Sequence, residues 1–176
     1  VTNAFINIAT NKVRGLDFNL RYVVPIGETT LRLNASATRY LEQASNINPN
    51  DPLDDDNGEI YYPKWTGDLD VTYDIGKVSF YYGLNWVGKM DSFAAVGEDR
   101  NDSIYQFATP NYFTHSASIR WKLEKFTLTA GVKNFTDKEP PQISAYVFNR
   151  LGNSPLYSGY DFVGRTYFMN FTAKVF

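Results

Sequence analysis

Apolar and polar side chains alternate one by one along several stretches of this chain. Between residues 16 and 24 the even positions carry Leu, Phe, Leu, Tyr and Val, whereas Asp17, Asn19 and Arg21 lie between them. A period of two is typical of a β-strand with one apolar and one polar face, and it differs from the helical period of 3.6. The same alternation recurs in residues 64–73, 78–86, 116–123 and 126–133.

We therefore predict an all-β fold of about eight strands. Most of these strands have about ten to thirteen residues, more than the five or six usual in globular proteins. A tilted strand needs roughly nine to eleven residues to cross a bilayer, so their length favours a membrane barrel. The expected strands cover residues 2–10, 13–25, 30–41, 61–73, 77–88, 112–123, 126–134 and 165–176.

The connections between these strands alternate in length. IGET, DIGK and LEK are tight turns, whereas segments 42–60, 89–111 and 135–164 are long, polar and rich in Pro, Gly, Asn and Asp. Outer-membrane barrels show this asymmetry, with short periplasmic turns and longer extracellular loops. The sequence thus predicts a transmembrane antiparallel up-and-down β-barrel. The link at residues 10–12 is the one short connection expected on the long-loop side.

In such a barrel the apolar positions face lipid and the polar positions face the lumen. Charges on the inward face of a small soluble barrel would be unfavourable unless paired. Five rings near strand ends (Trp65, Tyr73, Trp86, Trp121 and Phe126) fit the aromatic belts at the two membrane interfaces. The residues expected to face the lumen are Asp17, Arg21, Arg32, Asn34, Asp68, Asp70, Asn85, Arg120 and Lys133.

Composition narrows the functional classes. The 13 Tyr, 13 Phe and 3 Trp amount to 16% of the 176 residues, and this excess of rings needs a location such as an interface belt. The net charge of −2 gives no field that would attract nucleic acid. Cysteine is absent, which excludes disulfides and thiolate metal sites. No apolar run approaches the roughly 20 residues of a membrane-spanning helix, and the N-terminus lacks a signal-peptide pattern.

An acidic run, NPNDPLDDDNGE at residues 48–59, suggests calcium binding but fails the EF-hand spacing. If Gly58 takes the glycine position, Leu53 falls on the first ligand position and Lys64 on the twelfth. We interpret the run as a solvated loop, with weak cation binding by Asp54, Asp55 and Asp56 as the alternative. No cofactor is expected.

The other candidate residues lie near the long connections. A single histidine, His115, cannot form a multi-histidine metal site, and Ser116 beside it points to the opposite face of its strand. We therefore expect an interface position rather than a catalytic one. In the loop after residue 89, Arg100, Tyr105 and Phe107 are candidates for contact with a substrate, as are the three aspartates of the acidic run; packing is their alternative role.

Several stretches resemble the late strands of TonB-dependent receptors, the outer-membrane barrels that import scarce nutrients. The most specific are GVKNFTDKEPP (residues 131–141) and YDFVGRTYFMNF (160–171); RGLDFNLRY (14–22) and PKWTGDLDVTYDIGKVSFYYGLNWVGKM (63–90) agree with them. The resemblance covers essentially the whole chain. It implies the C-terminal part, about eight strands, of a barrel of about 22 strands in the outer membrane of a Gram-negative bacterium. The plug domain is not expected within residues 1–176.

The same resemblance implies the partners. They are outer-membrane lipid, a small nutrient of unknown identity, the TonB energy-coupling complex acting through the plug, and the barrel assembly machinery. Arg165, within GRTYF, is expected to have a structural role at the barrel mouth. Phe176 matches the terminal aromatic that the assembly machinery recognises, although its parity carries Asn170, Thr172 and Lys174; a bulge near the end would restore the phase.

Three alternatives stay open at this point. Eight strands could close a complete small barrel used for anchoring or adhesion. An outer-membrane barrel enzyme, such as a lipase or acyltransferase, would use His115 with a serine. A soluble sugar-binding β-protein would use its rings for saccharides instead of membrane interfaces.

Overall fold

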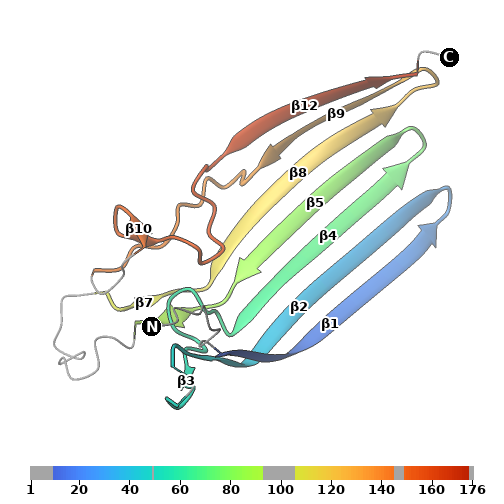
Figure 1. The fold of residues 1–176 in the computed structure, drawn as a ribbon. Coiled ribbons are helices and arrows are strands. Elements are labelled where there is room, and N and C mark those ends of the chain that lie inside the picture. Colours follow the sequence, from blue (N-terminus) through green and yellow to red (C-terminus); the bar gives the residue numbers. More distant parts are fainter. Residues whose placement is uncertain (1–9, 49, 93–105, 145–148, 175–176) are drawn as a thin grey trace, which may run out of the picture.

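A computed structural model describes residues 10–48, 50–92, 106–144 and 149–174. Seven long strands form one antiparallel sheet in the order β1-β2-β4-β5-β8-β9-β12 (Figure 1). Every long strand pairs with the next long strand along the chain, which confirms the predicted all-β, up-and-down fold. Their bounds are Thr10–Ile26 (β1), Thr29–Asn46 (β2), Trp65–Ile75 (β4), Val78–Val87 (β5), Tyr112–Lys122 (β8), Phe126–Lys133 (β9) and Thr166–Ala173 (β12).

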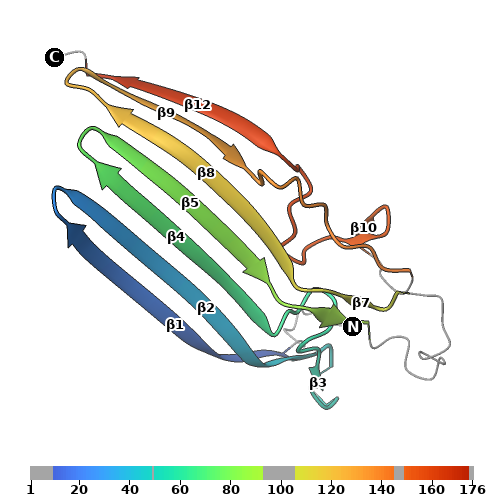
Figure 2. The same ribbon diagram turned by 180° about the vertical axis from the view of Figure 1, so that it is seen from behind.

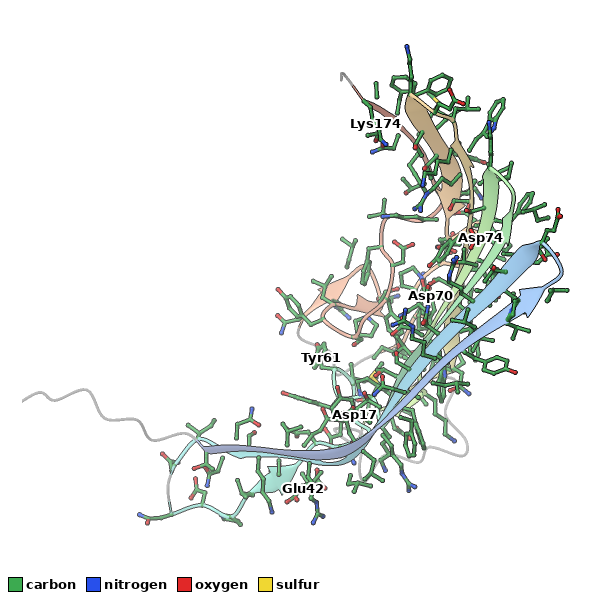
Figure 3. The ribbon with its side chains drawn as sticks, turned by 90° about the vertical axis from the view of Figure 1, so that its right-hand side faces the viewer. Asp17, Glu42, Tyr61, Asp70, Asp74 and Lys174 are labelled. Atoms are coloured by element: carbon green, nitrogen blue, oxygen red, sulfur yellow. The ribbon has the colours of Figure 1, made fainter. Side chains whose placement is uncertain are left out.

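The sheet is a single curved layer. Figures 1 and 2 show its strands lying side by side at a common tilt, with the tight turns at one end and the long connections at the other. Seen from the side in Figure 3, the layer bends, and the segment around Tyr61 lies over its concave side. Among the described residues β1 and β12 form no ladder with each other, so this part of the chain does not close into a complete small barrel.

The tight turns follow from local sequence. Gly27 and Gly76 have φ values of 60° and 54°, and each is the first of two residues joining a pair of strands. Glycine at this position suits a type II′ turn, whose twist matches that of the strands beside it. At the third turn the Leu123 amide bonds to the carbonyl of Phe126 across 2.8 Å. All three predicted turns are therefore confirmed.

The strands differ from the prediction in several places. The strand predicted at 30–41 continues to Asn46 (β2) and so takes in the first residues of the expected loop 42–60. Residues 10–12, predicted as a short link, are the start of β1 and pair with residues 44–46 of β2. The predicted strand at 61–73 begins at Trp65, because Tyr61 has a φ of 82° and residues 61–64 turn into the sheet. A register shift between Arg14 and Gly15 marks a β-bulge in β1. The predicted strand at 2–10 lies outside the described residues, apart from Thr10.

Short strands lie in the long connections. β3 (Asp54–Asp55) pairs with the end of β2, β6 (Met90–Asp91) with β7 (Ala108–Thr109), and β10 (Arg150–Leu151) with β11 (Ser154–Pro155). A small hydrophobic cluster, here called the loop core, forms where these connections meet the sheet. The loop core contains Ile60, Val87, Met90, Tyr112, Ile143 and Tyr160.

The apolar face of the sheet carries large exposed side chains, among them Phe18 (51% exposed), Leu20 (56%) and Trp121 (50%). Contiguous apolar surface of this kind marks a contact with lipid or protein. None of the described segments forms a helix long and apolar enough to cross a membrane.

Four rings on this face lie in contact near the loop end; we call them the aromatic row. Phe18 and Trp65 have ring centroids 6.2 Å apart, Trp65 and Trp86 6.0 Å, and Trp86 and Phe113 6.2 Å, all stacked. The row crosses from β1 to β8 over Ala37 and Gly67, which occupy the positions between Phe18 and Trp86 in the ladders. Small residues there leave space for the rings.

Candidate functional site

The polar face of the sheet is continuous from β1 to β12. The ladders place Arg21, Asn34 and Asp70 opposite one another, and the next row contains Asp68 and Asn85. Because side chains alternate between the two faces of a strand, opposed residues share a face. Figure 3 shows Asp70 and Asp74 on the concave side of the layer. The register gives one common face to Asp17, Arg21, Arg32, Asn34, Asp68, Asp70, Asn85, Arg120 and Lys133.

Carboxylates on this face accept hydrogen bonds from neighbouring strands. Thr38 donates to Asp17 across 2.7 Å and the Asn85 amide donates to Asp68 across 2.8 Å. The Tyr81 hydroxyl donates to Asp70. These bonds link β1 with β2 and β4 with β5, so the acidic half of the face is a connected polar surface.

Asp74 is a further member that the sequence-based set does not include. Its carboxylate pairs with Arg32 of β2 and accepts a hydrogen bond from Ser79 of β5. Arg32 is thus neutralised locally. The signal was present in the alternation, since Asp74 has the same parity as Asp68 and Asp70.

The last strands of the face differ in charge. β8, β9 and β12 contain no Asp or Glu, whereas Arg120, Lys122 and Lys133 project from the polar face. In the described part of the chain these three cations have no ion-pair partner. Arg120 and Lys122 line a cavity of about 500 Å³ together with Thr127, Thr129, Asn170 and Thr172. Cations among hydroxyl and amide groups can bind an anion.

The predicted loop residues lie in several environments. Arg100 and Tyr105 lie outside the described residues, as does Phe176. Phe107 is only 6% exposed, and its carbonyl accepts a bond from the Ser92 amide across 2.9 Å. Phe107 is therefore mostly enclosed by other residues.

The acidic loop is partly ordered by its own aspartates. Asp54 and Asp55 form β3, and Asp55 Oδ1 accepts hydrogen bonds from the amides of Gln43 (3.0 Å) and Asn57 (3.2 Å). Burial, together with the charges of Asp54 and Asp55, raises the pKa of Asp56. Burial also raises the pKa of Glu59, with smaller contributions from nearby carboxylates. Across the described ranges no three His, Cys, Asp or Glu side chains are grouped to hold a metal ion.

His115 lies on the apolar face of β8. Its Nδ1 is 2.8 Å from the Tyr82 hydroxyl, and its ring centroid is 5.8 Å from that of Phe135. Ser116 is on the other face, where its hydroxyl accepts a bond from the Asn134 amide across 3.4 Å. The structure therefore does not bring His115 and Ser116 together.

A turn at residues 134–138, here called the rim turn, ends β9 and was not predicted as a packed element. Asn134 is 1% exposed with a φ of 46°, and its side chain bonds to both backbone groups of Lys138, at 2.9 and 3.0 Å. Asp137, with a φ of 55°, accepts a bond from the Arg165 amide across 2.9 Å, and the Arg165 guanidinium lies 3.7 Å from the same carboxylate. Asn and Asp tolerate left-handed backbone better than other residues with a side chain. The presence of Asn134 and Asp137 directly after the strand was the feature of the sequence from which this turn could have been predicted.

The rim turn is also joined to the loop core. The Tyr112 hydroxyl donates to the Lys138 carbonyl across 3.1 Å and accepts from the Asp161 amide across 3.3 Å. Burial raises the pKa of Tyr160 to about 12, so this neighbouring hydroxyl stays protonated at physiological pH. Tyr112 and Tyr160 meet edge to face, with ring centroids 4.9 Å apart.

Comparison with known proteins agrees with this architecture. A family profile described as TonB dependent receptor-like, beta-barrel matches residues 1–135. The match ends at the start of the rim turn, so it includes only the first five residues of GVKNFTDKEPP. No significant match was found among curated proteins or among solved structures. With most of its length matched and with an up-and-down antiparallel sheet, the chain belongs to the β-barrel family of the TonB-dependent receptors, a family of outer-membrane transporters.

Proposed function

We propose that this chain is the C-terminal part of the barrel of an outer-membrane nutrient receptor in a Gram-negative bacterium. The concave face lines the passage and the convex face contacts lipid. The long connections lie outside the cell and contribute to capture of the nutrient. The plug, and the TonB complex that acts on it, are supplied from outside residues 1–176.

The observation that carries this proposal is the constant sidedness of all seven long strands. From β1 to β12 one face carries mainly Asp, Arg, Lys, Asn, Ser and Thr, and the other mainly Leu, Val, Phe, Tyr and Trp. The exceptions include Tyr81 and Phe168 on the polar face and Arg39 and His115 on the apolar face. In water, the exposed apolar face would be unfavourable by about 25 cal/mol for each Å² of apolar surface. In a membrane the same surface is matched to its surroundings, while the polar face requires water.

The concave face also suggests a substrate class. Its first strands carry carboxylates that accept hydrogen bonds, and Asp74 is paired with Arg32. Arg120, Lys122 and Lys133 instead leave a basic stretch of wall on β8 and β9. A nutrient with carboxylate, phosphate or other anionic groups would find donors there during passage. Arg100, Tyr105 and the aspartates of the acidic loop are the proposed contacts before entry, whereas the enclosed Phe107 supports the loop from within.

Sidedness can be tested by single cysteines, because residues 1–176 contain no cysteine; any cysteine elsewhere in the full-length protein is first replaced by serine. Two pairs of neighbouring small residues serve for the comparison: Ala35 with Ser36 on β2, and Ala117 with Ser118 on β8. In each pair the serine lies on the concave face and the alanine on the convex face. Each is replaced by Cys in the full-length protein in outer membranes and exposed to a small charged thiol reagent. We expect S36C and S118C to react, and A35C and A117C to react only after denaturation. Equal reactivity within each pair would contradict the proposed orientation.

Uptake is tested separately in a deletion strain. Accumulation of labelled iron chelates, cobalamin, oligosaccharides and aromatic acids is compared with that of the parent strain, with and without the energy-coupling protein. We expect loss of uptake of one of these nutrients in the deletion strain, and the same loss when energy coupling is removed. Unchanged accumulation of every nutrient would argue against a receptor role.

A further inference from the structure

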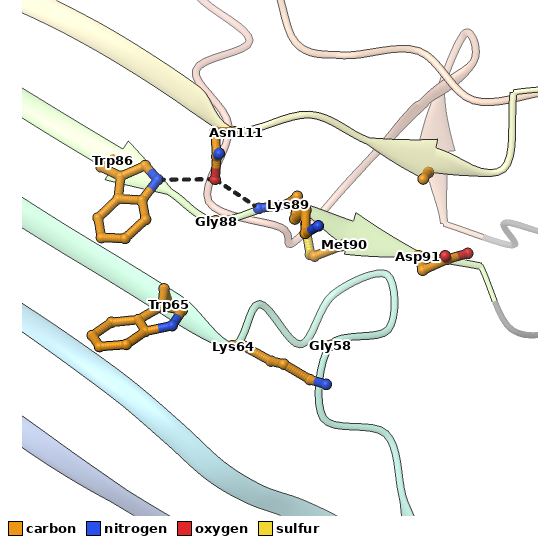
Figure 4. A pocket seen from close by; sticks show the side chains of 10 residues that line it. Gly58, Lys64, Trp65, Trp86, Gly88, Lys89, Met90, Asp91 and Asn111 are labelled. Atoms are coloured by element: carbon orange, nitrogen blue, oxygen red, sulfur yellow. Dashed lines mark hydrogen bonds between the residues drawn. The ribbon is translucent and has the colours of Figure 1, made fainter.

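A pocket of about 420 Å³ opens beside the aromatic row, where β4 begins and β5 ends (Figure 4). Two of its walls are the indole rings of Trp65 and Trp86, which belong to the apolar face of the sheet. The remaining wall comes from the loop before β4 and from the segment around β6. Its lining is Gly58, Lys64, Trp65, Trp86, Gly88, Lys89, Met90, Asp91, Ala108 and Asn111.

Two lysines give this pocket its charge. Lys64 and Lys89 are exposed, and neither forms an ion pair within the described ranges. Gly58, with a φ of 94°, makes room for Lys64: a Cβ at Gly58 would lie 2.5 Å from the Lys64 Cε atom and 3.2 Å from Cδ. Asp91 is the acidic residue of the lining, and its backbone is bonded to Gly58 and Ile60.

Asn111 adds a neutral side chain beside Trp86 and Lys89, across the pocket from Lys64 (Figure 4). Its Oδ1 atom accepts bonds from the Trp86 indole N–H (3.3 Å) and from the Lys89 amide (3.2 Å). The carbonyl end of the side chain is thus fixed, and within the described residues its NH₂ group has no hydrogen-bond acceptor, so it can donate to a ligand. Figure 4 shows Asn111 joined to both partners at the edge of the pocket.

The same edge of the apolar face carries a third cation. Arg39 lies directly opposite Trp65 in the β2–β4 ladder, with its guanidinium carbon 5.5 Å from the centroid of the indole ring. Lys and Arg next to an aromatic belt are typical of the level at which lipid headgroups lie. The apolar side chains of β1, β2, β4 and β5 continue from there toward the tight turns, along the path that acyl chains would take.

We infer that this pocket binds the phosphorylated headgroup of a lipid in the outer leaflet, with Lys64 on one side of the pocket, and Lys89 and Asn111 on the other, as contacts for the headgroup's phosphate groups. The lipid then places its first acyl carbons on the rings of Trp65 and Trp86. Complementary charge selects an anionic headgroup, and the adjoining apolar face selects a lipid over a free anion. This inference rests on the proposed membrane orientation of the sheet.

The test measures lipid retained by the purified full-length protein in nanodiscs that contain a phosphorylated glycolipid and an uncharged lipid. Bound lipids are counted by native mass spectrometry as the glycolipid is titrated. Near a membrane surface each lysine contributes about 1 kcal/mol to binding of anionic lipid, so K64Q/K89Q is expected to weaken retention roughly 25-fold. K64R/K89R, which keeps both charges, is expected to retain the glycolipid.

K122Q/K133Q serves as the control, since it removes the same charge from the concave face, and we expect its retention to be unchanged. Equal loss in this control would overturn the inference, because a general effect of charge would then explain the result. The inference is also overturned if K64Q/K89Q still retains the glycolipid, if the uncharged lipid binds equally well, or if inorganic phosphate at matched concentration displaces the glycolipid. The cysteine experiment tests the orientation on its own, so failure of the headgroup site alone leaves A35C and A117C protected.

Discussion

The side-chain amide of Asn134 donates a hydrogen bond to Asp161 Oδ2 across 3.1 Å, and this contact ties the end of β9 to the loop that leads into β12. Asp161 Oδ1 in turn accepts bonds from the amides of Val163 (2.9 Å) and Gly164 (3.3 Å). Asn134 and Asp161 are 27 residues apart in sequence, so two short polar side chains connect segments that are distant along the chain. The strand in GVKNFTDKEPP thus ends at a corner of the sheet that is held by specific side-chain hydrogen bonds.

Replacing Asn134 with Ala should destabilise the folded protein by about 2–4 kcal/mol, because buried hydrogen-bond partners lose their donor or acceptor. N134G should recover about 0.5–1 kcal/mol of that loss, since glycine adopts the positive φ without strain. The measurement is the denaturant midpoint of the detergent-solubilised full-length protein. Equal midpoints for wild type and N134A would show that the corner contributes nothing to stability.

Asp137 separates the hydrogen-bonding and ionic parts of the contact with Arg165. D137N keeps an acceptor for the Arg165 amide, and Asn tolerates the positive φ. It should therefore lower the free energy of unfolding by less than about 1 kcal/mol, the contribution expected of an exposed ion pair. D137A removes the acceptor as well, and we expect about 1–2 kcal/mol. The same unfolding assay distinguishes them, and a larger effect for D137N than for D137A would refute the assignment.

The acidic loop should be better ordered at low pH than at neutral pH. The raised pKa values of Asp56 and Glu59 show that the folded loop disfavours their charged forms. The corresponding stability is fully present below the unfolded carboxyl values near pH 4 and is lost as pH rises through the raised folded values. Hydrogen exchange of residues 54–59 should therefore be slower at pH 4 than at pH 7, after correction for intrinsic exchange.

D54N provides the matched variant, because the charge of Asp54 contributes to both pKa shifts. It should narrow the difference in protection between the two pH values, while K77Q at the opposite end of the sheet should leave it unchanged. If D54N widened the difference in protection between pH 4 and pH 7, repulsion among the carboxylates could not be the cause of that difference.

Gly67 should be hard to replace within the aromatic row. A Cβ at this position would lie 3.2 Å from Cε3 of Trp86 and 3.0 Å from the Ser36 carbonyl oxygen, which is closer than ordinary packing allows. We expect G67A to destabilise the protein by about 1–3 kcal/mol and to change the tryptophan emission. In a W86L background the effect of G67A should be smaller, and a double-mutant cycle with no coupling would exclude contact with the indole ring as its origin.

The alternation of side chains predicted most of this fold because one face of every long strand is apolar, and register then follows from which face each residue occupies. It failed at residues 61–64, where the predicted strand includes Tyr61 and Tyr62 although the alternation begins only at residue 64. There the Tyr61 hydroxyl donates to the carbonyl of Asn149 across 3.1 Å and accepts from the Asn149 amide across 3.0 Å. Because Asn149 is 88 residues from Tyr61, this contact could not be predicted from the residues around Tyr61.

The candidate site was predictable to the same extent. Residues of the concave face follow from parity, and the pair of Arg32 with Asp74 would follow once strands β2 and β4 are aligned. The lysine pocket could not be predicted, because Lys64 and Lys89 come from the irregular ends of two strands. They line one pocket with Trp65 and Trp86 only because the chain turns out of the ladder at these ends.

The loop core has a consequence for the order in which the protein folds. The ladders connect neighbours along the chain, so the sheet can grow one hairpin at a time. The loop core instead brings Ile60 against Tyr112, Ile143 and Tyr160, which come from beyond β5, β9 and β11. The loop core can therefore assemble only after β8, β9 and β11 have formed. Burial of its side chains then indicates that these later strands have paired in the correct register.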